Sequence, residues 1–138
     1  MPYYTNFMLH VEAADETGKT LGPITDASLL DELSKELAKM NVLSGYEGDA
    51  TWFAYDQRWY YSEEDMLLIS TRFPSMVFHL HGDGENPDDL WNAHYWNGKS
   101  QQCPAVIHYD PYDPAELEPA KKILEHYHYE QPDEPDEV

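Results

Sequence analysis

The stretch MVFHLH at residues 76–81 decides how this chain folds. Large apolar residues at positions 76, 78 and 80 alternate with Val77 and two histidines, which is the period of two that a β-strand shows. One face of this strand is strongly apolar and belongs against a core. The other face carries His79 and His81, whose side chains we expect to point the same way.

The same alternation predicts strands on either side of this stretch. Residues 7–11 and 52–55 indicate two earlier strands, and residues 101–109 a later one. Residues 91–96 indicate a strand, or a short helix running into one. Asn97-Gly98 is a type I′ turn signal, because both central positions of that turn need positive φ. We expect a turn-rich linker at 44–49 and an acidic loop at 82–89.

Helical spacing of apolar residues predicts three helices. The first is capped at residue 25 or 26, buries four apolar residues between Leu29 and Met40, and stops at Asn41. The second spans residues 63–73, begins at a capping box that opens with Ser62, and is ended by Pro74. The third starts at Pro119, because proline is tolerated in the first turn of a helix but clashes in its interior.

This order of elements predicts an α+β fold: a ferredoxin-like sandwich with a mostly antiparallel sheet and helices on one face. A chain of 138 residues fits one domain. We assign residues 1–129 to a single acidic α+β domain and residues 130–138 to a disordered acidic tail.

The charge of the chain limits its partners. There are 27 acidic residues against 8 Lys and Arg, a formal net charge of −19. Such a surface repels nucleic acid and anionic membranes and attracts basic proteins. Since 14% of the residues are aromatic, the chain is folded and not an acidic coil. A single cysteine, Cys103, and the absence of a signal-like N-terminus favour the cytoplasm.

Carboxylates gather in two segments of the sequence, and we take them, with one aromatic anchor, as a partner-binding surface. The residues are Asp83, Glu85, Asp88, Asp89, Trp91, Asp110, Asp113 and Glu116. An alternative is a metal site in which His79, His81 and Asp83 share one strand face. Our preferred hypothesis involves no metal, no cofactor and no catalytic residue.

Part of the chain resembles a known family. The similarity runs through short motifs in order: Trp59–Met66, Phe73-Pro74, Phe78–Glu85, Asp89–Trp91 and Asn97–Lys99. Over about residues 52–108 the chain is similar to the YubB-type ferredoxin-like domain of small phage, plasmid and bacterial proteins. The resemblance implies a fold and a mobile-element setting, in which small acidic proteins often disarm host defence nucleases.

These observations together suggest a phage-type inhibitor that acts in the host cytoplasm. It would bind the basic groove of a nucleic-acid-handling defence complex, such as a CRISPR effector or a restriction enzyme, and mimic nucleic acid. Two alternatives stay open: a small metal-binding or hydrolytic enzyme that uses His79, His81 and Asp83, and a housekeeping interaction domain. The sequence does not define the oligomeric state.

Overall fold

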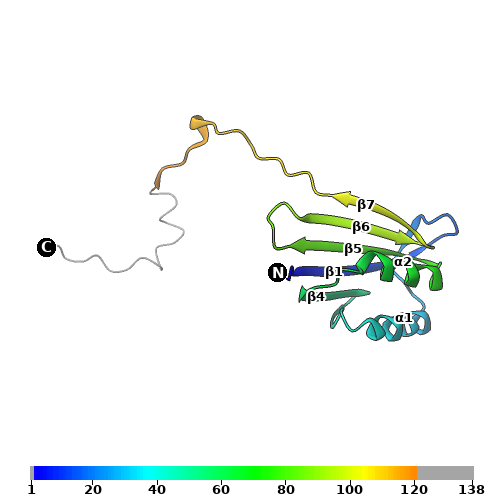
Figure 1. Ribbon diagram of the computed structural model, residues 1–138. Helices are drawn as coiled ribbons and strands as arrows, with labels where there is room; N and C mark the ends of the chain where they lie inside the picture. Colours follow the sequence, from blue (N-terminus) through cyan, green and yellow to red (C-terminus); the bar gives the residue numbers. More distant parts are fainter. Residues whose placement is uncertain (1, 121–138) are drawn as a thin grey trace, which may run out of the picture. The chain divides into compact units, whose positions relative to one another are not determined.

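The computed structural model describes residues 2–120, and its strands form one antiparallel sheet (Figure 1). The strand order is β3-β4-β1-β5-β6-β7, and β2 pairs with the end of β1. The elements are β1 (Thr5–Ala14), β2 (Thr20–Gly22), α1 (Ala27–Met40), β3 (Gly45–Gly48), β4 (Thr51–Gln57), α2 (Ser62–Arg72), β5 (Met76–Gly84), β6 (Leu90–Trp96), β7 (Lys99–Pro104) and the short 3₁₀ turn η1 (Pro114–Glu116).

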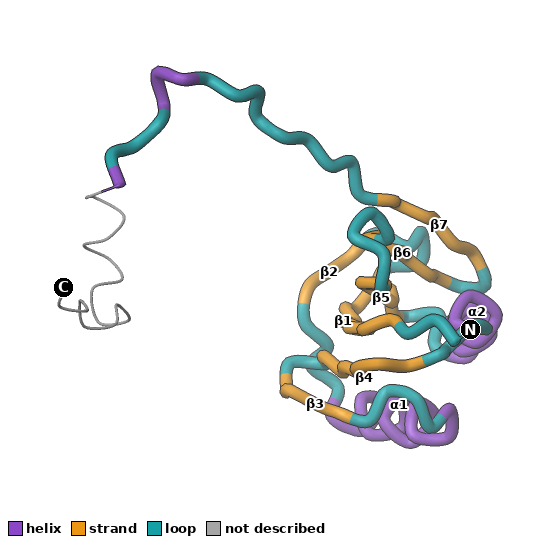
Figure 2. The backbone as a smooth tube through the Cα atoms, turned by 60° about the vertical axis from the view of Figure 1, so that its left-hand side comes forward, coloured by secondary structure: helices purple, strands orange, loops and turns teal. Residues whose placement is uncertain are grey.

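Both long helices lie on the same face of the sheet (Figures 1 and 2). Helix α1 begins as predicted: the Asp26 carboxylate accepts hydrogen bonds from the backbone N–H groups of Ser28 and Leu29. It ends at Asn41, which takes the left-handed conformation at φ 56°. Asparagine tolerates that conformation better than most residues, so it suits the end of a helix.

Helix α2 starts differently from our prediction. Its N-cap is Tyr61, no side chain caps the helix, and Ser62 is already the first helical residue, so the predicted capping box is wrong. The three acidic residues of the first turn still favour the start, because they face the positive end of the helix dipole. The helix ends before Pro74, as predicted.

The core lies between the helices and one face of the sheet. The buried side chains that alternate along the strands contact those of the two helices, and the cluster is Phe7, Leu9, Val11, Leu33, Leu37, Leu43, Ala50, Trp52, Ala54, Trp59, Met66, Ile69, Phe73, Met76, Phe78, Leu80, Ala93 and Tyr95. Fully burying one large apolar side chain of this kind stabilises a fold by about 1.5–3 kcal/mol. We call this side of the sheet the closed face.

Two loop predictions and one strand prediction need correction. Residues 44–49 are not only a linker, because Gly45–Gly48 form the edge strand β3. The acidic loop is shorter than predicted, since Gly82–Gly84 belong to β5. The last strand ends at Pro104 instead of residue 109. The turn at Asn97-Gly98 is confirmed: φ is 49° at Asn97 and 77° at Gly98.

The α+β class and the antiparallel sheet are confirmed, but a ferredoxin-like sandwich is not. That arrangement contains split βαβ units, whose strands are parallel. The order β3-β4-β1-β5 contains two such units, in which α1 leads from β1 to β3 and α2 leads from β4 to β5. The strands β2, β6 and β7 are additional to that arrangement. No helix within residues 2–120 is long and apolar enough to span a membrane.

The chain divides into two units, the first ending at Ile107 and the second beginning at His108. Within the second unit the Asp113 carboxylate caps η1 by accepting the N–H of Ala115 at 3.0 Å. The helix predicted from Pro119 lies almost wholly outside the described residues. The predicted domain boundary at residue 129 and the acidic tail also lie outside them.

Candidate functional site

The acidic loop, residues 85–89, joins β5 to β6 and is held by the N-terminal segment. The Tyr3 hydroxyl donates to Asp89 Oδ2 at 2.6 Å, and the Tyr4 backbone N–H donates to the Glu85 carboxylate. The hydrogen bond to Asp89 raises the pKa of Tyr3. Glu85 and Asp89 therefore have a structural role, although Glu85 is exposed, as are Asp83 and Asp88.

The structure brings only part of the predicted partner surface together. Asp83, the acidic loop and Trp91 share one end of the sheet, while Asp110, Asp113 and Glu116 belong to the second unit. Trp91 is not a fully exposed anchor, because it is partly buried and meets Phe7 edge to face at 6.2 Å. Its ring lies over Gly82, where a Cβ atom would collide with it.

The face of the sheet opposite the helices, which we call the open face, carries four histidines. The strand register places His10, His79 and His94 in one row across β1, β5 and β6, and places His81 in the next row. Thr51 and Gln101 continue the first row on β4 and β7. We refer to His10, His79, His81 and His94 as the histidine face.

Three side chains of this region form a continuous chain. His79 Nε2 lies 2.8 Å from Glu12 Oε1, and His79 Nδ1 lies 2.8 Å from His94 Nδ1. Burial, and to a lesser degree the neighbouring His79, lowers the pKa of His94. His10 stacks beside His79 with ring centroids 6.3 Å apart and contacts Thr51 Oγ1 at 3.0 Å.

The metal alternative gains no support from this geometry. His79 is engaged by Glu12 and His94, and His81 Nδ1 contacts Asn92 Oδ1 at 2.8 Å. Within residues 2–120 no three His, Cys, Asp or Glu side chains are grouped so that they could hold a metal ion. Asp83 shares the strand face with both histidines but joins neither in a cluster.

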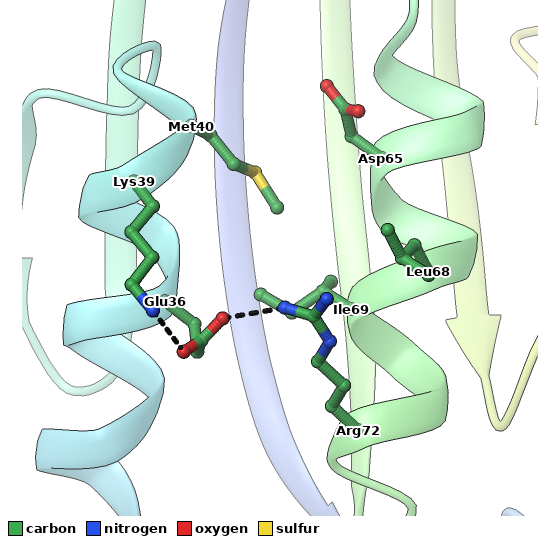
Figure 3. Close-up of a pocket in the computed structure, with 7 residues that line it drawn as sticks. All are labelled: Glu36, Lys39, Met40, Asp65, Leu68, Ile69 and Arg72. Atoms are coloured by element: carbon green, nitrogen blue, oxygen red, sulfur yellow. Dashed lines mark hydrogen bonds and ion pairs between the residues drawn. The ribbon is translucent and has the colours of Figure 1, made fainter.

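A groove of about 350 Å³ separates the two helices (Figure 3). Glu36 lies at its centre and binds two cations: Arg72 Nη1 at 2.7 Å and Lys39 Nζ at 3.0 Å. The hydrogen bond from Lys39 is the main cause of the lowered pKa of Glu36. Leu68 is exposed beside this groove, so the groove combines an ion network with an apolar wall.

Sequence reasoning missed Glu12 and His94, the two partners of His79. The sequence does indicate the face on which each residue lies, because alternate residues of a strand share a face. Glu12 is two residues from His10, and His94 is two residues from Asn92 and Trp96. Finding them needed the pairing register, which brings together residues 67 positions apart. Comparison of the chain with protein-family models, curated proteins and solved structures finds no match.

Proposed function

We propose that this protein is a non-catalytic acidic binding protein that occupies a basic, nucleic-acid-binding groove on another protein. The observation that carries the proposal is the surplus of carboxylates on the folded unit itself. Residues 1–107 hold 17 acidic residues against 6 Lys and Arg, so the imbalance does not come from the tail alone. A surface of this kind accelerates encounter with a cationic partner.

Five of the six Lys and Arg side chains of this unit contact groups within the unit, so they do not offset the surplus of carboxylates. Lys39 and Arg72 bind Glu36, and Lys35 binds Asp31 at 3.2 Å. Arg58 lies over the Tyr4 ring and Lys99 over the Trp96 ring. Exposed carboxylates such as Asp83 and Asp88 remain available for charge-assisted hydrogen bonds from Lys and Arg of a partner.

The proposed mechanism is occupancy: carboxylates take the places of nucleic-acid phosphates and exclude the natural ligand. The identity of the target, a CRISPR effector or restriction enzyme in a host cytoplasm, rests on the resemblance of residues 52–108 to the YubB-type family. The order β3-β4-β1-β5, with its two split βαβ units, is compatible with the ferredoxin-like domain that the resemblance implies. A housekeeping interaction domain without mimicry is the competing proposal.

The test starts with capture of partners from bacterial cytosol by the tagged full chain at low salt. For each purified pair, Kd is then measured at rising ionic strength. We expect affinity to fall about tenfold or more, because the Debye length shortens from about 30 Å at 0.01 M to about 8 Å at 0.15 M. An affinity that stays flat with salt contradicts the proposal, as does a partner that binds this protein and DNA at the same time.

A matched pair of variants locates the contact. Asp83→Lys with Asp88→Lys reverses two exposed charges at the acidic end of the sheet, and Glu63→Lys with Glu64→Lys makes the same charge change on α2. We expect the first pair to weaken binding about tenfold or more and the second to weaken it less, since close charges act most strongly. If both pairs of variants weaken binding equally, the attraction depends on total charge and not on the position of the carboxylates. Unchanged binding in both favours the housekeeping interaction domain.

A further inference from the structure

The chain Glu12–His79–His94 ties together three adjacent strands of the open face. Its members come from β1, β5 and β6, and both contacts measure 2.8 Å. The side chains of His79 and Glu12 are 25% and 28% exposed, so water is only partly excluded. The chain is independent of the acidic end of the sheet that our proposed function uses.

The positions of the nitrogens require a single proton between the two rings. The ring centroids lie 5.0 Å apart, and 2.8 Å of that distance separates the two Nδ1 atoms, so each ring points its Nδ1 corner at the other. Two N–H groups or two lone pairs would repel in this position. One nitrogen must therefore donate and the other accept.

Glu12 restricts the arrangement further. An ionised carboxylate only accepts hydrogen bonds, so His79 Nε2 must carry a hydrogen. If His79 is neutral, its Nδ1 is the acceptor and His94 donates through Nδ1–H. If His79 is an imidazolium, His79 donates and His94 carries its hydrogen on Nε2. Both states hold the strands together with one proton between the rings.

A metal ion does not fit between the rings as they stand. Each metal–nitrogen bond measures about 2.0–2.1 Å, so an ion placed directly between two facing nitrogens needs about 4 Å. The observed separation is 2.8 Å. The geometry is that of a shared proton.

We propose that Glu12, His79 and His94 form a pH-sensitive contact on the open face, closed while one proton lies between the two rings and opened by a second. With a second proton, the Nδ1–H groups of His79 and His94 would point at each other and repel, so the rings must separate. Acidification then loosens the link between β5 and β6 and gives the open face positive charge.

Among the neighbours that the structure describes, Glu12 favours a proton on His79, whereas the groups facing His94 are uncharged or basic. From β1, Glu12 is the acidic neighbour and His10 is a further titratable group. From β7, uncharged Gln101 pairs with His94, and Lys99 lines the same hollow as His94. On β5 itself the neighbour is His81, which contacts Asn92.

The experiment uses the full chain labelled with ¹⁵N, and follows the imidazole nitrogens by NMR between pH 8 and pH 5. At pH 7.5 we expect a scalar coupling between the two Nδ1 nuclei, transmitted through the shared hydrogen. As the pH falls the coupling is lost when a second proton enters the pair, and interacting sites of this kind take up their protons in linked steps.

Variants make the outcome decisive. His94→Gln should convert the titration of His79 to one step, whereas His10→Gln, on the same face, should leave both steps in place. If His94→Gln fails to give a folded amide spectrum, His79→Gln provides the reciprocal measurement on His94. Independent titrations with no Nδ1–Nδ1 coupling overturn the proposal, and so does a wild-type spectrum that changes when EDTA is added.

Discussion

The two faces of β5 are stabilised by different kinds of interaction. On the closed face, Phe78 and Leu80 are buried against the helices, and stability comes from apolar area removed from water. On the open face, His79 contacts β1 and β6 through hydrogen bonds that depend on where protons lie. The first kind of interaction responds to changes of side-chain volume and the second to pH.

Truncation of the closed face should give the largest effect. Phe78→Ala removes a fully buried ring, and we expect a loss of about 3–5 kcal/mol in the free energy of unfolding, because a cavity is left in the core. Met8→Ala, on the open face, should change it by about 0.5 kcal/mol, as exposed positions do. Urea unfolding followed by circular dichroism measures both. Equal losses would mean that something covers the open face.

A polar residue within the closed face offers a second comparison. Ser70 is fully buried, donates to the Leu67 carbonyl at 2.8 Å, and accepts the Gly98 N–H at 2.9 Å. Ser70→Ala leaves that N–H without its acceptor, so we expect a loss of about 1–3 kcal/mol.

The neighbouring Thr71→Ala is the control for this prediction. Thr71 also donates to a carbonyl of its own helix, at 2.6 Å from Leu68 O, but it is exposed. We expect a change of about 0.5 kcal/mol from it. If Ser70→Ala proves as mild as Thr71→Ala in urea unfolding, water replaces the lost acceptor and the turn at Gly98 does not depend on Ser70.

Much of the closed face could be predicted from the sequence because its signals are local. Alternation at residues 7–11 and 76–81 identifies buried side chains without knowledge of their partners. The cap at Asp26 and the turn at Asn97-Gly98 are equally local. Gly45–Gly48 escaped prediction because an edge strand with two glycines has weak propensity and forms through pairing with β4.

The site was harder to predict because it depends on register. A shift of one residue between β1 and β5 would move Glu12 to the other face and away from His79. Nothing near residue 12 in the sequence indicates this register, because the partner of Glu12 lies 67 positions further along the chain. The alternative metal set of His79, His81 and Asp83 lies on one strand, and the contacts of its two histidines lie on the neighbouring strands.

The smallest expected effect is the pH dependence of stability that arises from the open face. The pKa of His94 is lowered in the folded protein, first by burial and then by His79, from an ordinary value of 6.5. The unfolded chain therefore binds a proton at this position more readily than the folded one. Stability present above pH 6.5 is lost as the pH falls through that value towards the folded pKa.

The measurement is the change in Tm between pH 7.5 and pH 5.5, compared among variants so that the titration of the many carboxylates cancels. His94→Gln should show a smaller fall in Tm than the wild type, because the group that takes up the extra proton on unfolding is gone. His108→Gln removes an exposed histidine that belongs to the second unit and should keep the wild-type fall. If His94→Gln loses as much Tm on acidification as the wild type, the acid sensitivity lies elsewhere, and the open face is held by its backbone pairing alone.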